Sequence, residues 1–132
     1  MGAMREILFR GRRVDNGEWE TGSLVYARMG TSEEQASIAD KMTAYHTPVI
    51  PETVGQYTGL TDKNGNKIFE GDIIHGFGGN FAVRWSPEIC SFVAGEGRRI
   101  LPAMTYGTMK SFEVIGNIYD NPELLKGSIE NE

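Results

Sequence analysis

The sequence predicts an α+β fold that is predominantly β, with an N-terminal β-rich subdomain followed by a C-terminal SH3-like small barrel. Two observations carry this prediction. Seventeen of the 132 residues are glycine, five are proline, and many short apolar runs lie between them, a pattern typical of short strands joined by tight turns. Asn-Gly, which favours the type I′ turn of a β-hairpin, occurs at Asn16-Gly17 and Asn64-Gly65.

Composition limits the class of protein. Apolar residues make up 39% and charged residues 23% of the chain, which is typical of a folded domain rather than a disordered one. No run approaches the roughly 18 apolar residues of a membrane span, so we expect no membrane partner. The single cysteine, Cys90, has no partner for an internal disulfide, which favours a reducing, cytoplasmic location. We expect Cys90 to be a small buried apolar residue, because it lies in an apolar run.

The first part of the chain, residues 4–52, is the predicted β-rich subdomain. Residues 1–3 are interpreted as a remnant of an expression tag. A hairpin is expected around residues 15–18, with a kink at Gly22. Residues 28–47 leave two alternatives open, because Ser32 to Gln35 resembles a helix capping box, whereas residues 43–47 favour a strand; the segment is either a short helix or a second, irregular hairpin. Val49-Ile50 lies between prolines and is at most a short edge strand.

Residues 53–125 are the predicted barrel, packed with the first part into one compact unit. Gly71-Asp72 precedes β-branched residues, as at the first strand of many small barrels, and a turn follows at residues 76–80. Further strands are expected at residues 81–85, 89–94 and 112–119, whereas 100–110 is ambiguous. Asn121 and Pro122 predict the N-cap and first position of a terminal helical turn, and residues 126–132 are expected to be a tail.

Five blocks of the sequence resemble the YopX family of phage and prophage proteins. The blocks are Arg5–Gly11, Gly22–Leu24, Ile50–Gly65, Ile68–Ile74 and Val114–Leu125. The resemblance covers most of the chain. It implies a fold with an N-terminal α+β part and an SH3-like barrel, and a phage or prophage source, but no particular activity and no functional residues.

The residues capable of chemistry do not form a recognisable catalytic set. The two histidines, His46 and His75, and the one cysteine lack metal-ligand spacing, so no metal and no cofactor are expected. Glu70 and Asp72 lie two residues apart, but Gly71 between them predicts a turn in which Asp72 accepts backbone N–H groups. The acidic and amide residues at 62–66 fail the spacing of a calcium loop and predict a hairpin turn instead. We therefore expect no enzyme activity.

Arginines and aromatic residues are the remaining candidates for a binding surface. The binding residues predicted from the sequence are Arg10, Arg12, Arg13, Arg98, Arg99 and Trp85. Small barrels often bind nucleic acid or peptides through such side chains. The net charge of −5 is spread evenly along the chain and disfavours non-specific nucleic-acid binding. The competing interpretation is that these arginines pair with surface carboxylates while the aromatic residues fill the core.

The sequence therefore favours a non-enzymatic binding or assembly module of phage origin that acts in the cytoplasm of the host cell. Exposed strand edges of a small β domain can be covered by a second copy, so a homo-oligomer is expected. A nucleic-acid-binding accessory protein is the first alternative, and a small enzyme is the second and weaker one.

Overall fold

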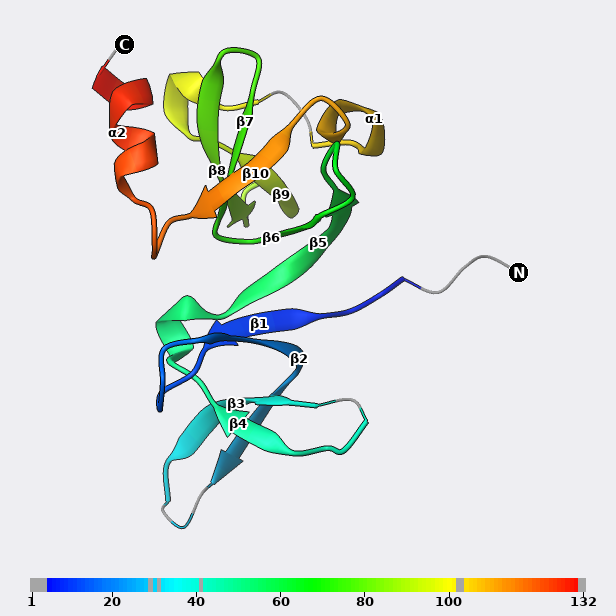
Figure 1. The fold of residues 1–132 in the computed structure, drawn as a ribbon, viewed down its shortest axis with the longest axis vertical. Helices are drawn as coiled ribbons and strands as arrows, with labels where there is room; N and C mark the ends of the chain where they lie inside the picture. Colours follow the sequence, from blue (N-terminus) through cyan, green and yellow to red (C-terminus); the bar gives the residue numbers. More distant parts are fainter. Residues whose placement is uncertain (1–4, 29, 31, 41, 102–103, 131–132) are drawn as a thin grey trace. The chain divides into compact units, whose positions relative to one another are not determined.

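The computed structural model describes residues 5–28, 30, 32–40, 42–101 and 104–130, and it divides into two compact units, Met1–Tyr57 and Thr58–Glu132 (Figure 1). Both units consist mainly of antiparallel strands, so the predicted, predominantly β fold is confirmed. The sequence had placed the boundary at residue 52. The structure pairs Gly55 and Gln56 with a strand of the first unit. Residues 1–3, interpreted as a tag remnant, lie outside the described residues.

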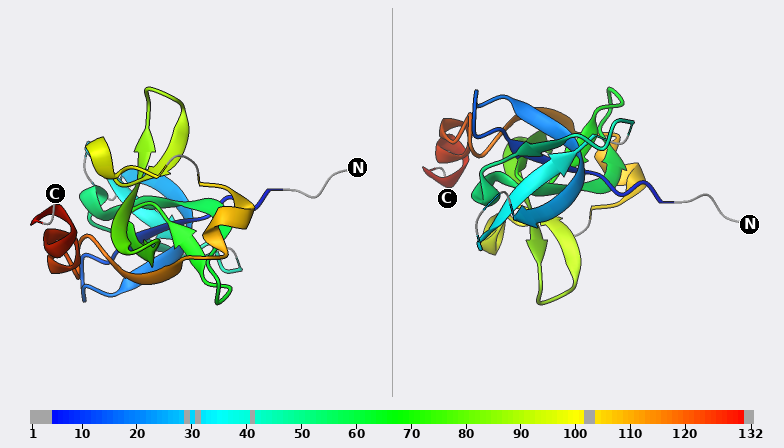
Figure 2. Two further views of the ribbon diagram at one scale, coloured as in Figure 1. Left: turned by 90° about the horizontal axis from the view of Figure 1, so that it is seen from above. Right: turned by 90° about the horizontal axis from the view of Figure 1, so that it is seen from below.

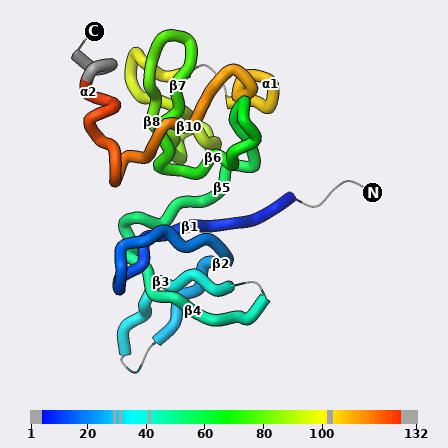
Figure 3. The backbone as a smooth tube through the Cα atoms, in the orientation of Figure 1, coloured from blue at the N-terminus to red at the C-terminus, as the bar shows by residue number. Residues whose placement is uncertain are grey.

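The first unit is a curled antiparallel sheet. Its elements are β1 (Phe9–Arg12), β2 (Trp19–Arg28), β3 (Glu34–Ala39), β4 (His46–Pro48), the short 3₁₀ helix η1 (Pro51–Thr53) and the beginning of β5 (Gly55–Thr61). Hydrogen-bonded neighbours follow the order β4-β3-β2-β1-β5. Just after β1 and β4, the two ends of the sheet meet, where Arg13 forms an antiparallel β-bridge with Val49. The sheet therefore curls back on itself, as the tube in Figure 3 allows the reader to trace.

Two glycines of this sheet lie very close to neighbouring residues. A Cβ on Gly11 would lie 2.9 Å from the Val49 side chain, and one on Gly22 would lie 2.4 Å from the Ala39 carbonyl oxygen. Neither approach leaves room for a side chain. The apolar core lies inside the curl; it consists of Ala36, Ile38 and Val49, with Phe9, Leu24 and Val54 packed against it.

Residues 34–39 form a strand, so the irregular hairpin is confirmed and the helix is wrong. Every residue of β3 pairs with β2, from Glu34 opposite Arg28 to Ala39 opposite Ser23. These pairs satisfy the backbone in a way that also buries Ala36 and Ile38 in the core. The local capping signal at Ser32 was outweighed by the tertiary environment, as often happens with intrinsic helix propensity.

The two Asn-Gly sites form turns, but neither is of the predicted type I′. That turn requires positive φ at both central residues. Gly17 has a φ of 74° and Gly65 a φ of 83°, whereas Asn16 and Asn64 are not among the residues with positive φ. A two-residue loop with positive φ at both positions does occur between β7 and β8, where Phe77 has a φ of 51° and Gly78 a φ of 77°.

The second unit contains an antiparallel sheet in the order β10-β7-β8-β9. Its elements are the later part of β5, then β6 (Lys67–Phe69), β7 (Asp72–Gly76), β8 (Gly79–Ser86), β9 (Ser91–Ala94), the 3₁₀ helix η2 (Gly97–Arg99), α1 (Tyr106–Met109), β10 (Glu113–Asn117) and α2 (Glu123–Glu130). The β8–β9 hairpin, drawn yellow-green, is clear in both views of Figure 2. The SH3-like description of this unit stays a prediction.

The core of the second unit surrounds Phe112, which is fully buried. The other buried members of the cluster are Ile68, Ile74, Phe81, Val83, Ala94, Leu101 and Met109. Gly76 lies directly against Phe112, because a Cβ at that position would be 2.6 Å from Cδ2 of the ring. Phe77, at the hairpin tip, is 70% exposed but still packs edge-to-face on Phe112 with a centroid distance of 4.8 Å.

Two aspartates fix turns of this unit; this role was predicted for Asp72, whereas at residues 62–66 only the turn itself was predicted. Asp72 accepts the Phe69 N–H at 2.7 Å across the turn between β6 and β7. Asp62 Oδ1 accepts the N–H groups of Asn64 and Asn66, each at 2.9 Å. Both carboxylates are buried, so these hydrogen bonds compensate for their lost hydration.

Cys90 and the C-terminus depart from the expectations. Cys90 is exposed, with a φ of 51°, in the turn before β9; the prediction of a buried thiol is wrong, because the apolar run is interrupted by this turn. Residues 126–130 of the expected tail continue α2, and 131–132 lie outside the described residues. The predicted terminal helical turn is confirmed as α2, which follows Pro122, although Asn121 uses its Oδ1 to accept the Asn117 N–H at 3.2 Å.

Candidate functional site

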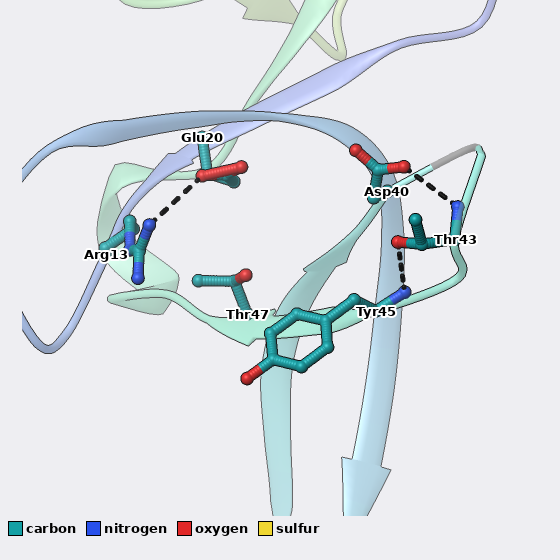
Figure 4. Close-up of a pocket in the computed structure, with 6 residues that line it drawn as sticks. All are labelled: Arg13, Glu20, Asp40, Thr43, Tyr45 and Thr47. Carbon is teal, nitrogen blue, oxygen red and sulfur yellow. Dashed lines mark hydrogen bonds and ion pairs between the residues drawn. The ribbon is translucent and has the colours of Figure 1, made fainter.

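The first unit contains a surface pocket of ≈460 Å³ formed by side chains from both of its hairpins (Figure 4). The lining residues are Arg13, Glu20, Asp40, Thr43, Tyr45 and Thr47. Arg13 follows β1 and Glu20 lies in β2, whereas the other four belong to β4 or to the loop between β3 and β4. The volume falls in the range of about 300–1,000 Å³ that small-ligand sites occupy.

One wall of the pocket is a clamped arginine. Arg13 donates from Nε to Asp15 Oδ1 at 3.0 Å and from Nη2 to Asp15 Oδ2 at 2.9 Å. Its Nη1 lies 3.7 Å from Glu20 Oε2 on the other side. The hydrogen bond to Asp15 raises the pKa of Arg13 and lowers that of Asp15. The guanidinium charge is therefore balanced by carboxylates of the same chain, and a bidentate hydrogen bond to Asp15 holds the group in place.

The opposite wall is a turn organised by hydrogen bonds to Asp40. Its Oδ1 accepts the Met42 N–H at 2.8 Å and the Thr43 N–H at 3.0 Å. The Asp40 N–H donates to the Tyr45 carbonyl at 3.0 Å, and Ala44, with a φ of 60°, completes the turn. Backbone N–H groups of Thr43 and Met42 lower the pKa of Asp40. Asp40 is thus a fixed anion at neutral pH and poorly suited to taking up a proton.

Thr47 forms the floor and Tyr45 the rim. Tyr45 is 72% exposed, whereas Thr47 is only 8% exposed. In Figure 4 the Thr47 side chain points into the hollow between Glu20 and Tyr45. Thr47 Oγ1 is not among the buried polar atoms that lack a partner in the described chain, so the hydroxyl is a group of the pocket surface that a ligand atom can contact.

The arginines predicted from the sequence fall into separate groups. Arg10 and Arg12 lie over the Trp19 ring, at 4.9 Å and 5.0 Å from its centroid. These are cation–π distances, so two guanidinium groups already contact the one indole ring. Arg13 belongs to the pocket instead. The structure therefore gives these three neighbouring arginines two different environments.

The other predicted binding residues belong to the second unit. Arg98 and Arg99 form the end of η2, where Arg98 is exposed and Arg99 lies against Gly79. Trp85 is 44% exposed and packs edge-to-face on Phe92 at 5.1 Å between ring centroids. Within this unit, nothing in the described contacts joins Trp85 to the η2 arginines.

Sequence reasoning missed five of the six pocket residues. It found Arg13 by its charge, but Glu20, Asp40, Thr43, Tyr45 and Thr47 come from a segment whose structure was left open or from an unremarkable strand position. The one available signal was Asp40 ahead of Thr43, since Asp readily accepts the N–H groups of the next residues and so organises a turn. In the part of the chain that the structure describes, no three His, Cys, Asp or Glu side chains gather as a metal site.

Comparisons with known proteins place the chain in context. A family model described as YopX protein matches residues 8–126. Among solved structures, protein EF1440 from Enterococcus faecalis is similar, with a TM-score of 0.58 and 21% sequence identity over 93% of this chain and 100% of that chain. No curated protein matches. Within the described ranges, no helix is both long and apolar enough to cross a membrane.

Proposed function

Starting from the fact that the chain belongs to the YopX family, we propose that it is a non-enzymatic binding or assembly module, of phage or prophage origin, that acts in the cytoplasm of the host. The pocket of the first unit is its binding site. The observation that carries this proposal is the Thr47 side chain, which belongs to a residue only 8% exposed and points into a hollow lined by fixed polar groups.

The geometry supports binding rather than catalysis. Arg13 is held by Asp15 and Glu20, and Asp40 is held by two backbone N–H groups. Pre-organised groups of this kind lower the entropic cost of recognition. The pKa values of Asp15 and Asp40 are both lowered. A carboxylate that acts as a general acid or base requires a pKa raised toward neutrality instead.

A peptide-display experiment tests the proposal on the full chain. A random peptide library is selected against the wild-type protein and then screened against Asp40→Asn and Tyr45→Ala. We expect selected peptides to bind both variants more weakly than they bind wild type. Two matched controls are Glu34→Gln, an exposed acid at the far end of β3, and Tyr26→Ala, whose tyrosine is 59% exposed in β2; both should keep binding. If every selected peptide binds the two pocket variants as well as wild type, the pocket is not the binding site.

Self-assembly is the second part of the proposal. The order β10-β7-β8-β9 leaves β9 as the last strand of its sheet in the described chain, and such an edge is open to pairing with another chain. Light scattering coupled to size-exclusion chromatography is the measurement. A protein that stays monomeric at high concentration would remove assembly from the proposal and leave the pocket untouched.

Nucleic-acid binding is a second candidate function, favoured by the gathering of Arg10 and Arg12 on Trp19. Two guanidinium groups on one aromatic ring form a compact basic patch that phosphates could contact. Fluorescence anisotropy with single- and double-stranded DNA tests it. Binding that weakens with salt and is lost in Arg10→Gln/Arg12→Gln would support this function, and no binding at low salt would end it.

A further inference from the structure

We propose that the pocket of the first unit takes up an organic cation, namely the guanidinium or ammonium group of an Arg or Lys side chain on a protein partner. This inference rests on the proposed binding function and names the chemistry of the ligand.

Charge is the first argument. The Arg13 guanidinium is matched by Asp15 at 2.9 Å and shared with Glu20 at 3.7 Å. Among the described residues, the groups that shift the pKa of Asp40 by hydrogen bonding are the N–H groups of Thr43 and Met42 and the Thr43 hydroxyl, and none of these is basic. Among the described residues that line the pocket, two carboxylates, Glu20 and Asp40, thus face one guanidinium. The surplus is negative, so a cation is attracted and an anion is repelled.

Hydrogen-bonding capacity is the second argument. The Glu20 and Asp40 carboxylates accept hydrogen bonds, and Glu20 lies at only the ion-pair distance of 3.7 Å from Arg13, so it keeps lone pairs for a further donor. The Thr47 hydroxyl can accept as well, and its side chain points into the hollow. A ligand with several N–H donors around one positive centre satisfies all three, and guanidinium and ammonium groups have that arrangement.

The rim supplies the third argument. Tyr45 presents a 72% exposed ring beside the hollow, and a cation near the face of such a ring gains a further attraction. The pocket volume of ≈460 Å³ is larger than the volume of one guanidinium group. Residues that flank the cation in a peptide can therefore enter the pocket with it. This favours a protein side chain over a free small amine as the occupant.

The turn between Asp40 and Tyr45 holds these two pocket residues in one arrangement, so the site selects ligands by shape as well as by charge. Ala44 has a φ of 60°, a left-handed conformation that is unfavourable for a residue with a side chain. The Asp40 hydrogen bonds and the Thr43 Oγ bond from the Tyr45 N–H at 3.2 Å stabilise it. Backbone held in such a conformation is frequent at ligand sites, and here it lies in the turn that joins the pocket residues Asp40 and Tyr45.

A nuclear magnetic resonance titration of the full ¹⁵N-labelled chain tests the inference. The probes are N-acetyl-arginine-N-methylamide, the neutral citrulline analogue of the same shape, N-acetyl-glutamate-N-methylamide and free methylguanidinium. We expect the arginine probe to shift the amide signals of Tyr45 and Thr47 saturably, and the citrulline probe to bind at least about tenfold more weakly, which corresponds to roughly 1.4 kcal/mol. Asp40→Asn should weaken the binding of the arginine probe about threefold, which is within the energy range of one exposed ion pair.

The variant is chosen so that the loop survives, because the amide oxygen of Asn can still accept the Met42 and Thr43 N–H groups. Glu34→Gln is the matched control and should leave the affinity unchanged. Equal binding of the arginine and citrulline probes, or tighter binding of the glutamate probe, would overturn the assignment of a cation. Methylguanidinium binding as tightly as the arginine probe would overturn the assignment of a protein side chain. Selected peptides that need the pocket but contain no Arg or Lys would refute this inference and leave the proposed function standing.

Discussion

The Asp62 carboxylate accepts the Val114 backbone N–H at 2.9 Å, a contact between residues 52 positions apart in the chain. The same carboxylate closes the β5–β6 turn through Asn64 and Asn66. It is fully buried. A single side chain therefore fixes a local turn and attaches β10 to it, which connects two segments of the second unit that the sequence separates.

Replacing Asp62 should destabilise the second unit. In Asp62→Asn, an NH₂ group must take the place of one carboxylate oxygen and will face N–H donors. Because a buried donor without an acceptor is costly, we expect the free energy of unfolding to fall by about 2 kcal/mol. Urea unfolding measures it, with Asp120→Asn as the control, since Asp120 is an exposed acid. Equal losses in the two variants would contradict the proposed role of Asp62.

Asp62 should also make the free energy of unfolding depend on pH. Burial raises the pKa of Asp62, but the N–H groups of Val114, Asn66 and Asn64 outweigh burial, and the net pKa is lowered. A lowered pKa in the folded state adds stability above the ordinary aspartate pKa of about 3.9, and this contribution is lost as pH falls through the folded value. Between pH 7 and pH 3, wild type should lose more stability than Asp62→Asn. Parallel pH profiles would refute this prediction.

Gly76 should not tolerate a methyl group. A Cβ there would lie 2.6 Å from the buried Phe112 ring, and overpacking of this kind costs about 1–3 kcal/mol. We expect Gly76→Ala to lower the midpoint of thermal unfolding. The matched control is Gly107→Ala in α1, where a Cβ meets nothing within 4 Å, and where alanine should hold or raise stability. A Gly76→Ala protein as stable as the Gly107→Ala protein would contradict the close approach.

At position 77, glycine should give a more stable protein than alanine, which reverses their usual order. The φ of Phe77, 51°, is left-handed, which costs a residue with a side chain about 1–2 kcal/mol. Phe77→Gly and Phe77→Ala both remove the edge-to-face contact with Phe112, so their difference isolates the backbone. We expect Phe77→Gly to be more stable than Phe77→Ala by about 1 kcal/mol in urea unfolding. The opposite order would exclude a left-handed residue at this turn.

Cys90 should react in the folded protein. The thiol is exposed and makes only a weak contact, 3.7 Å from Sγ to the Pro87 carbonyl. We expect Ellman's reagent to label it in native buffer nearly as fast as in urea, since exposure largely controls access to a thiol. A reaction that requires unfolding would restore the expectation of a buried cysteine. The Cys90→Ala variant, which should give no signal, is the control.

Turn positions were the most predictable part of the fold. Gly17, Gly65 and Gly71 each take positive φ at a turn that the sequence indicated, because glycine alone adopts this conformation without steric cost. Asp72 was also foreseen as an acceptor at its turn. Phe77 and Cys90 escaped prediction for the converse reason, since they adopt positive φ although their side chains disfavour it, and only the surrounding hairpins hold them there.

The sequence by itself determined the family resemblance, the predominance of strands and most hairpin turns, since these depend on residue types and on contacts between near neighbours. Only the tertiary structure decided that residues 34–39 form a strand, because the choice rested on pairing with β2. It also decided the pocket, which joins Arg13 to Asp40 and Thr47. Arg13 meets Val49 only when the first sheet curls on itself, and curling is a property of the whole sheet that no short stretch of residues contains.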